Sequence, residues 1–170
     1  GSRYERALAS GKSQECGAIY RTYLKNAKRV NSWDLVDSSA PNVVGRHLLP
    51  LSDSQVIKTL QKLARSKNIW ERRIAIVSTH SMIRAERLRP TGVIAELLLA
   101  DGEDLIHKAS GWMLREAGAR DPSWLKAWVK RKGRDMPRTM LRYSIEHWTP
   151  AERARILRET RPVRKSHRGP

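Results

Sequence analysis

The chain has 170 residues, enough for one domain with a sizeable hydrophobic core. Lys and Arg total 34 against 17 Asp and Glu, and the net charge of +17 predicts attraction to a polyanion. Nucleic acid is the leading candidate because basic residues are spread along the whole chain, with an anionic membrane surface as the alternative. No apolar run approaches the roughly 20 residues of a membrane-spanning helix, and no signal-peptide pattern opens the chain. These features argue against a membrane partner.

The only cysteine, Cys16, excludes an internal disulfide and favours a reducing, intracellular setting. Its place on an apolar helix stripe predicts core packing rather than chemistry. The opening Gly1-Ser2 resembles an expression-vector remnant, which would place the start of the chain inside a longer protein.

Helical periodicity dominates and no segment alternates in the manner of a strand, which predicts an all-α fold. A last helix is predicted from "TPAE", with Thr149 as N-cap, Pro150 at the first helical position and Glu152 closing a capping box. We expect one domain over residues 1–160 and a disordered basic tail over 161–170. The other predicted helices span residues 14–26, 32–38, 41–49, 53–64, 68–84, 90–99, 103–119, 122–131 and 137–147.

Pairs of predicted helices recur at roughly 30 to 36 residues, a spacing typical of a HEAT-like helical-repeat solenoid. The segments "WERRIAIVSTHSMIR" and "IHKASGWMLREAGAR" can be superposed so that both end on arginine, Arg84 and Arg120. One row of helices lines the concave side of such a superhelix. In a chain this basic, that side would form a concave basic groove wide enough for a duplex.

Several kinds of active site are not indicated by the sequence. The five histidines are dispersed and one cysteine cannot make a zinc cluster, so we expect no metal. Phosphate-binding glycine loops, nucleophile elbows and the signatures of common nucleic-acid-binding motifs are also missing, and we expect no cofactor.

The stretch "NSWDLVD" places acids at the start of a predicted helix. If Asn31 is the N-cap, Asp34 sits at the third helical position. There its carboxylate can reach back to the backbone N–H of the cap and meet the positive end of the helix dipole. Asp34 therefore has a structural explanation.

Asp37 has no such capping role. It lies four residues beyond Trp33 on the same helix face, while Leu35 and Val36 are expected to turn toward the core. A tryptophan beside a carboxylate can bind a sugar and stabilise a cation. An ordinary surface acid is the alternative interpretation of Asp37.

Four segments, "YLKNAKRVNSWDLVDSSAPNVVG", "NIWERRIAIVSTHSMIR", "DLIHKASGWMLREAG" and "MPRTMLRYSIEHW", together resemble the AlkD-type DNA alkylation-repair family over about Tyr20 to Trp148. Members of that family are HEAT-like-repeat glycosylases that excise alkylated purines. The resemblance assigns Trp33 and Trp112 as active-site aromatics, Asp37 as the catalytic carboxylate, and Arg73 as a basic residue beside the DNA backbone at the lesion.

The resemblance implies a monofunctional glycosylase that acts on duplex DNA with alkylated bases, without a base-flipping pocket. An N3- or N7-alkylated purine is already cationic and leaves without a general acid. A fixed carboxylate can then stabilise the positive charge on the deoxyribose and orient water, while tryptophan faces hold the sugar. We expect a cytoplasmic monomer located with nucleoid DNA.

One departure from the family pattern concerns the N-terminus, where almost nothing precedes the "YLKN" helix although family members usually carry further helices. This predicts a fragment or a shortened member. A non-catalytic DNA-binding member of the same superfamily is therefore the first alternative. A protein-binding helical-repeat scaffold is the second, although the charge of +17 fits it poorly.

Three further basic residues fall near the starts of the longer second helices, where a concave row would meet phosphates: Arg72, Lys108 and Arg138. The remaining tryptophans are interpreted as packing residues. Trp70 is predicted to lie in the core, Trp124 and Trp128 between helices, and Trp148 at the join before the last helix.

Overall fold

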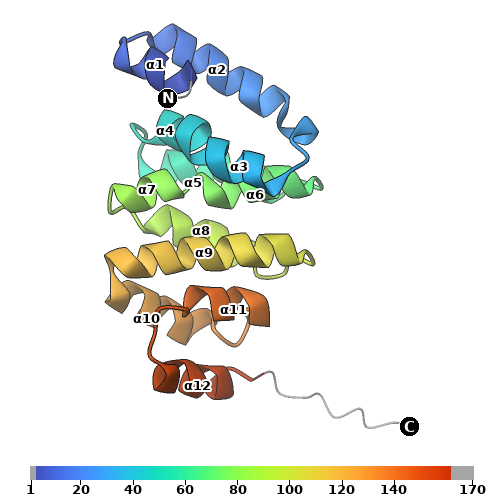
Figure 1. The fold of residues 1–170 in the computed structure, drawn as a ribbon, viewed down its shortest axis with the longest axis vertical. Helices are drawn as coiled ribbons and strands as arrows, with labels where there is room; N and C mark the ends of the chain where they lie inside the picture. Colours follow the sequence, from blue (N-terminus) through green and yellow to red (C-terminus); the bar gives the residue numbers. More distant parts are fainter. Residues whose placement is uncertain (1–2, 162–170) are drawn as a thin grey trace, which may run out of the picture.

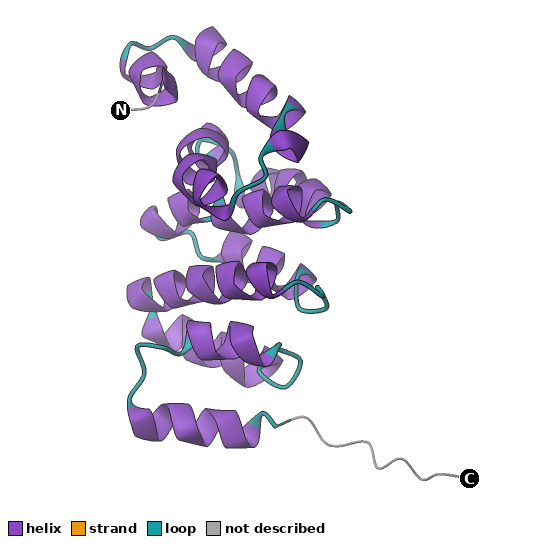
Figure 2. Ribbon diagram, turned by 45° about the vertical axis from the view of Figure 1, so that its right-hand side comes forward, coloured by secondary structure: helices purple, strands orange, loops and turns teal. Residues whose placement is uncertain are grey.

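The computed structural model describes residues 3–161 as helices joined by short loops, with no strand in that range (Figures 1 and 2). The predicted all-α class is confirmed. The helices stack one above another along the long axis, from α1 at one end to α12 at the other (Figure 1). Residues 1–2 and nearly all of the predicted tail lie outside the described residues.

In chain order the helices are α1 (Arg3–Ala9), α2 (Ser13–Lys25), α3 (Trp33–Ala40), α4 (Arg46–Leu48), α5 (Asp53–Ala64), α6 (Ile69–Val77), α7 (His80–Arg84), α8 (Arg89–Leu97), α9 (Asp104–Arg120), α10 (Pro122–Lys132), α11 (Arg138–Ser144) and α12 (Pro150–Glu159). A 3₁₀ turn covers Ala27–Arg29 and a π-helical turn covers Pro41–Gly45. The capping box predicted for α12 is present, since Thr149 and Glu152 satisfy each other's backbone N–H groups.

The single helix predicted over residues 68–84 is wrong, because α6 and α7 are separate. Two hydroxyl side chains occupy the joint, where Ser78 donates to the carbonyl of Ile74 at 2.6 Å and Thr79 to that of Ile76 at 2.7 Å. Such local bonds compete with the helical backbone pattern. Helical spacing of apolar residues does not report this competition.

The separation predicted between the helices over residues 32–38 and 41–49 is also wrong. Ala40 and Pro41 both have right-handed helical dihedrals, and the chain runs from α3 through the π-helical turn into α4. A π turn accommodates the missing N–H of proline inside a helix. The Pro41 carbonyl accepts a hydrogen bond from the Ser81 hydroxyl at 2.8 Å, which attaches this turn to α7.

The first helix, α1, was missed by the sequence analysis. Tyr4 and Ala7 on α1 are buried with Cys16 of α2 and Val43 of the π-helical turn, forming a small second core. The packing role predicted for Cys16 is therefore observed. The apolar residues of α1 are too few for the seven-residue helix to stand out by periodicity.

Helices α3, α6, α9 and α11 pack successively against one another, whereas α5 packs against α6 and α8, and α10 packs against α9. The large core lies between these two sets of helices. Trp124 and Trp128 of α10 pack against Gly92 of α8, which is the inter-helix role predicted for them. Trp70 and Trp148 are half-buried against the same core.

Close packing of α9 on α11 requires a glycine at position 111. A Cβ there would lie 2.5 Å from the Cβ of Tyr143 and 2.6 Å from the carbonyl oxygen of Met140. Overpacking of this kind costs about 1–3 kcal/mol, so Gly111→Ala should lower the melting temperature by several degrees. Gly102→Ala is the control, because its Cβ would meet nothing within 4 Å. Equal melting of the two variants would contradict this close approach.

Candidate functional site

The site begins at the N-terminus of α3, where Ser32 rather than the predicted Asn31 is the N-cap. The Ser32 hydroxyl donates to the Asp34 carboxylate, and this bond is the main reason that the pKa of Asp34 is lowered. Asp34 thus sits at the second helical position and is fully accounted for by local structure.

One helical turn of α3 presents Trp33 and Asp37 on the same face, as predicted. The Trp33 side chain is prominent at the surface, with 55% of the residue exposed. Val36 is buried as expected, but the prediction for Leu35 is wrong, since that residue is 53% exposed. The core-facing stripe of α3 is therefore narrower than its apolar sequence indicates.

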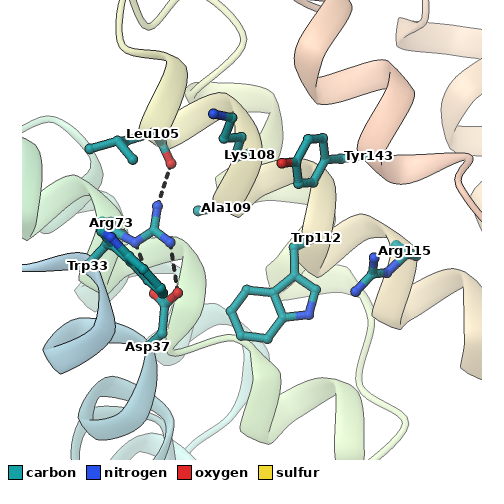
Figure 3. A pocket seen from close by; sticks show the side chains of 9 residues that line it. All are labelled: Trp33, Asp37, Arg73, Leu105, Lys108, Ala109, Trp112, Arg115 and Tyr143. Carbon is teal, nitrogen blue, oxygen red and sulfur yellow. Dashed lines mark hydrogen bonds and ion pairs between the residues drawn. The ribbon is translucent and has the colours of Figure 1, made fainter.

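A two-bond ion pair holds the Asp37 carboxylate. Arg73 of α6 donates from Nε to Asp37 Oδ1 at 2.9 Å and from Nη2 to Asp37 Oδ2 at 2.8 Å. Its remaining Nη1 donates to the backbone carbonyl of Leu105, at the start of α9, at 2.5 Å. Because Arg73 is only 5% exposed, one buried guanidinium fixes the carboxylate of α3 relative to α6 and α9 (Figure 3).

An open cavity of about 370 Å³ lies beside this ion pair. Trp33 stands next to the pair and Trp112 lies across the cavity from it (Figure 3). Helices α3, α6, α9 and α11 all contribute to the wall. The lining residues are Trp33, Asp37, Arg73, Leu105, Lys108, Ala109, Trp112, Arg115 and Tyr143.

Trp112 is half-buried and lines the cavity with its indole ring. The indole N–H donates to Glu116 Oε1 at 3.0 Å, and the ring centroid lies 6.2 Å from that of His80. Gly111, the residue before Trp112, is packed closely against α11. Trp112 is therefore held in a defined orientation without being a fully buried core anchor.

Lys108 is the second predicted basic residue that the structure brings to the cavity. Its ammonium group lies 2.9 Å from the Asp104 carboxylate one turn earlier on α9. This hydrogen bond and the negative charge of Asp104 raise the pKa of Lys108. At neutral pH the side chain is therefore a cation at the edge of the site.

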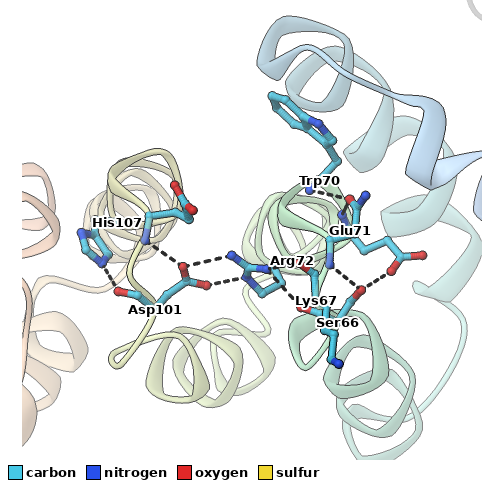
Figure 4. A network of polar contacts seen from close by, with 9 residues as sticks. Ser66, Lys67, Trp70, Glu71, Arg72, Asp101 and His107 are labelled. Carbon is cyan, nitrogen blue, oxygen red and sulfur yellow. Dashed lines mark hydrogen bonds and ion pairs between the residues drawn. The ribbon is translucent and has the colours of Figure 1, made fainter.

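The predicted phosphate-binding residue Arg72 does not reach the cavity. It donates to both carboxylate oxygens of Asp101, at 2.6 and 3.2 Å, and to the carbonyls of Ser66 and Lys67, at 3.1 and 3.0 Å (Figure 4). These bonds connect α6 to the loops on either side of it. The Arg72 side chain therefore has a structural role, because it holds these segments together.

Arg138 is likewise engaged internally. Its guanidinium donates to the carbonyl of Leu157 at 2.9 Å and to the hydroxyl of Thr160 at 3.2 Å, at the C-terminal end of α12. Burial is the first cause that lowers the pKa of Arg138. The helix-start register that suggested phosphate contact for this residue places it between α11 and α12.

Among the charged and aromatic residues of the cavity wall, Arg115 and Tyr143 were not predicted from the sequence. Arg115 follows Trp112 by three residues on the same face of α9 and forms ion pairs with Glu116 and Glu146. Its spacing from Trp112 could have identified it. Tyr143, an exposed aromatic on α11, gave no comparable signal.

A second cavity of about 420 Å³ was also missed. It adjoins the first through His80, which contacts Trp112 and lines the second cavity. The two arginines that line it, Arg46 and Arg84, have no ion-pair partner in the described range 3–161. Burial is the first cause that lowers the pKa of His80, so this imidazole is neutral at neutral pH.

These features define an all-helical protein with an aromatic-walled, cationic cavity centred on one carboxylate. The model of the DNA alkylation repair enzyme family matches residues 4–148, which include every residue of that cavity. The chain belongs to this family. Its role is accordingly in DNA alkylation repair, with DNA as the partner.

Comparison with curated proteins and with solved structures found no match. Across residues 3–161 no helix is long and apolar enough to cross a membrane. In the same part of the chain, no three potential metal ligands of the His, Cys, Asp or Glu type gather at one place.

Proposed function

We propose that the protein is a monofunctional DNA glycosylase that hydrolyses the N-glycosidic bond of cationic N3- and N7-alkylated purines in duplex DNA. In this proposal Asp37, Trp33 and Trp112 act on the deoxyribose of the lesion. The helix pairs form a HEAT-like repeat whose concave side receives the duplex. The observation that carries the proposal is the Asp37 carboxylate, fixed by Arg73 at the wall of a cavity flanked by two tryptophans.

The carboxylate suits a reaction that develops positive charge on a sugar. Each oxygen of Asp37 accepts one bond from Arg73, which leaves further lone pairs free to face an oxocarbenium-like C1′ and to orient a water molecule. Because the guanidinium already fixes the carboxylate, little reorganisation is needed when charge develops. Such preorganisation is a large part of many enzymatic rate enhancements.

The aromatic side chains supply the second part of the site. The electron-rich faces of Trp33 and Trp112 can hold the sugar and attract its developing cation. Trp33 is 55% exposed at the rim, so the deoxyribose can approach while the base stays outside a closed pocket. A base that is already cationic needs no general acid in order to leave.

Lys108 bears on whether the enzyme also cuts the strand. A bifunctional glycosylase uses a neutral amine to attack the sugar and form a Schiff base. Asp104 raises the pKa of Lys108 and keeps it as an ammonium ion, which is not a nucleophile. This supports water as the nucleophile and a monofunctional reaction.

The proposed phosphate contacts follow from which cations line the two cavities. Arg72 and Arg138 bond inside the fold and Arg73 is buried, so the contacts shift elsewhere. Lys108 and Arg115 line the first cavity, each also paired with a carboxylate, and Arg46 and Arg84 line the second. Each phosphate neutralised should add about −0.9 to the slope of log K against log salt. The cations of the two adjoining cavities would then contact phosphates along one DNA backbone.

Product analysis tests the proposal. Incubation with methylated duplex DNA should release free N7-methylguanine and N3-methyladenine and leave abasic sites that break only after alkali. Borohydride should trap no covalent adduct between protein and DNA. Strand breakage without alkali, together with a trapped adduct, would replace the monofunctional mechanism by an amine-based one.

The Trp112→Ala variant tests whether Trp112 acts in the reaction or only packs against its neighbours. A fully buried tryptophan would lose about 3–5 kcal/mol on truncation to alanine, but Trp112 is only half-buried beside a cavity. We expect a melting temperature close to that of the parent and base release at least about tenfold slower, a barrier increase of roughly 1.4 kcal/mol. A variant that unfolds readily, yet excises normally when cold and folded, would show that Trp112 is a packing residue of the core.

A further inference from the structure

A third cavity, of about 410 Å³, lies between α10 and α12 and shares no lining residue with the other two. We call it the C-terminal cavity. The family model ends at residue 148, so α12 lies beyond the matched span and this cavity is built partly from chain outside it. Its lining residues are Lys126, Val129, Lys130, Arg134, Trp148, Arg155, Ile156, Glu159 and Thr160.

The rim of the C-terminal cavity is strongly basic. Four of its side chains are cations and only Glu159 is an acid. Lys126 pairs with Glu152 at 3.0 Å, and Arg155 lies 4.0 Å from Glu159. Lys130 and Arg134 are exposed and have no ion-pair partner among the residues described. The rim therefore retains positive charge that is free to meet an anion.

The cavity also has an apolar wall with an aromatic ring. Val129 is buried, while Ile156 and Trp148 are half-buried and line the cavity. The ammonium group of Lys126 lies 5.8 Å from the centre of the Trp148 ring. A ligand here would meet an aromatic surface and cations together, so inorganic phosphate alone would leave part of the cavity unused.

The cations are spaced along one direction. Lys126, Lys130 and Arg134 recur every four residues, which at 1.5 Å per residue separates neighbours along α10 by about 6 Å. Arg134 continues the series just past the end of the helix. This repeat is comparable to the separation of successive phosphates along an extended nucleic-acid strand.

We propose that the C-terminal cavity binds single-stranded nucleic acid, with Lys130 and Arg134 on successive phosphates and a base against Trp148. A basic groove combined with an aromatic platform is the usual arrangement for single strands. Duplex bases are stacked and cannot present a face to Trp148. An acidic peptide would use the cations but gains less from the aromatic wall.

The test is equilibrium binding of a short oligothymidylate to the whole chain at several salt concentrations. Lys130→Ala/Arg134→Ala should weaken binding at low salt at least about tenfold. It should also make the log K against log salt slope shallower by about 1.4, since each single-strand phosphate contributes roughly 0.7. The matched control is Lys58→Ala/Lys62→Ala, which removes two exposed cations one turn apart on α5 and should leave the affinity near that of the parent.

A second variant tests the proposed contact between a nucleic-acid base and Trp148. Trp148→Leu keeps an apolar side chain against the core and should weaken oligothymidylate binding about tenfold, with the melting curve showing that the protein is folded. Parent-like binding by the double charge variant would overturn the proposal. Equal competition by polyglutamate, or tighter binding of an undamaged duplex at this cavity, would overturn it as well.

The inference is independent of the glycosylase proposal. Release of N7-methylguanine from methylated duplex should be unchanged in Lys130→Ala/Arg134→Ala, because neither residue lines the cavity of Asp37. If the chain binds oligothymidylate through Trp148 but releases no base, the glycosylase proposal is wrong and the proposal of a single-strand site stands.

Discussion

Asp37→Asn should slow release of N7-methylguanine by about 10²–10³-fold, the range seen when one preorganised electrostatic group is removed from an active site. The amide is similar in size but carries no charge to oppose the cation developing on the deoxyribose. Duplex binding should remain largely intact, because Asp37 repels rather than attracts phosphates. Single-turnover base release and duplex binding, measured side by side, separate the two effects.

The Asp37 variant also leaves the buried Arg73 guanidinium without its counter-charge, so its melting temperature should fall and the assay must be run where it is folded. Asp34→Asn is the matched control, one turn away on the same helix. Its carboxylate is exposed and bonds Ser32, so excision should persist. If Asp34→Asn were inactive and Asp37→Asn fully active, the assignment of the carboxylate would be wrong.

Arg73→Lys should be the second most damaging change, although it conserves the charge. A lysine ammonium cannot hold two parallel bonds to Asp37 and a third to the Leu105 carbonyl, because it lacks the planar fork. We expect a lower melting temperature and base release at least about tenfold slower, a barrier increase of roughly 1.4 kcal/mol. The carboxylate would still be present but no longer fixed.

Arg72→Lys is the control for this experiment, since it makes the same substitution one residue away. Arg72 bonds Asp101 outside the cavity, so its loss should lower stability and leave excision by the folded protein unchanged. The salt dependence of duplex binding should be the same for Arg73→Lys and the parent. If Arg73→Ala made that slope shallower by about one unit with normal excision, Arg73 would be a phosphate contact, as the sequence resemblance implies.

Much of the fold could be predicted from the sequence because helix ends carry local signals. The helix over residues 53–64 and the capping box at Thr149 were located to the residue. The continuous passage through Pro41 could not be predicted, because it depends on a π turn held by Ser81, forty residues later. The division between α6 and α7 depends on hydroxyl bonds that apolar spacing does not report.

The candidate site, too, could be predicted only in part. The helical spacing of Trp33 and Asp37 placed both on one face of α3, and the resemblance supplied Trp112. The partner of Asp37 is thirty-six residues away, so its identity as a buried ion-pair residue requires the packing of α3 on α6. The charges of Arg72 and Arg138 were visible in the sequence, but their internal acceptors were not.

The central claim is that this chain breaks the glycosidic bond of a cationic purine. The most direct measurement is single-turnover release of base from two duplexes that differ in one residue, N7-methylguanine in one and the neutral O6-methylguanine in the other. We predict release of free N7-methylguanine and no release of O6-methylguanine, because only the first base leaves without a general acid. Salt-sensitive binding of both duplexes with no release of either base would contradict the claim and leave a non-catalytic DNA-binding protein.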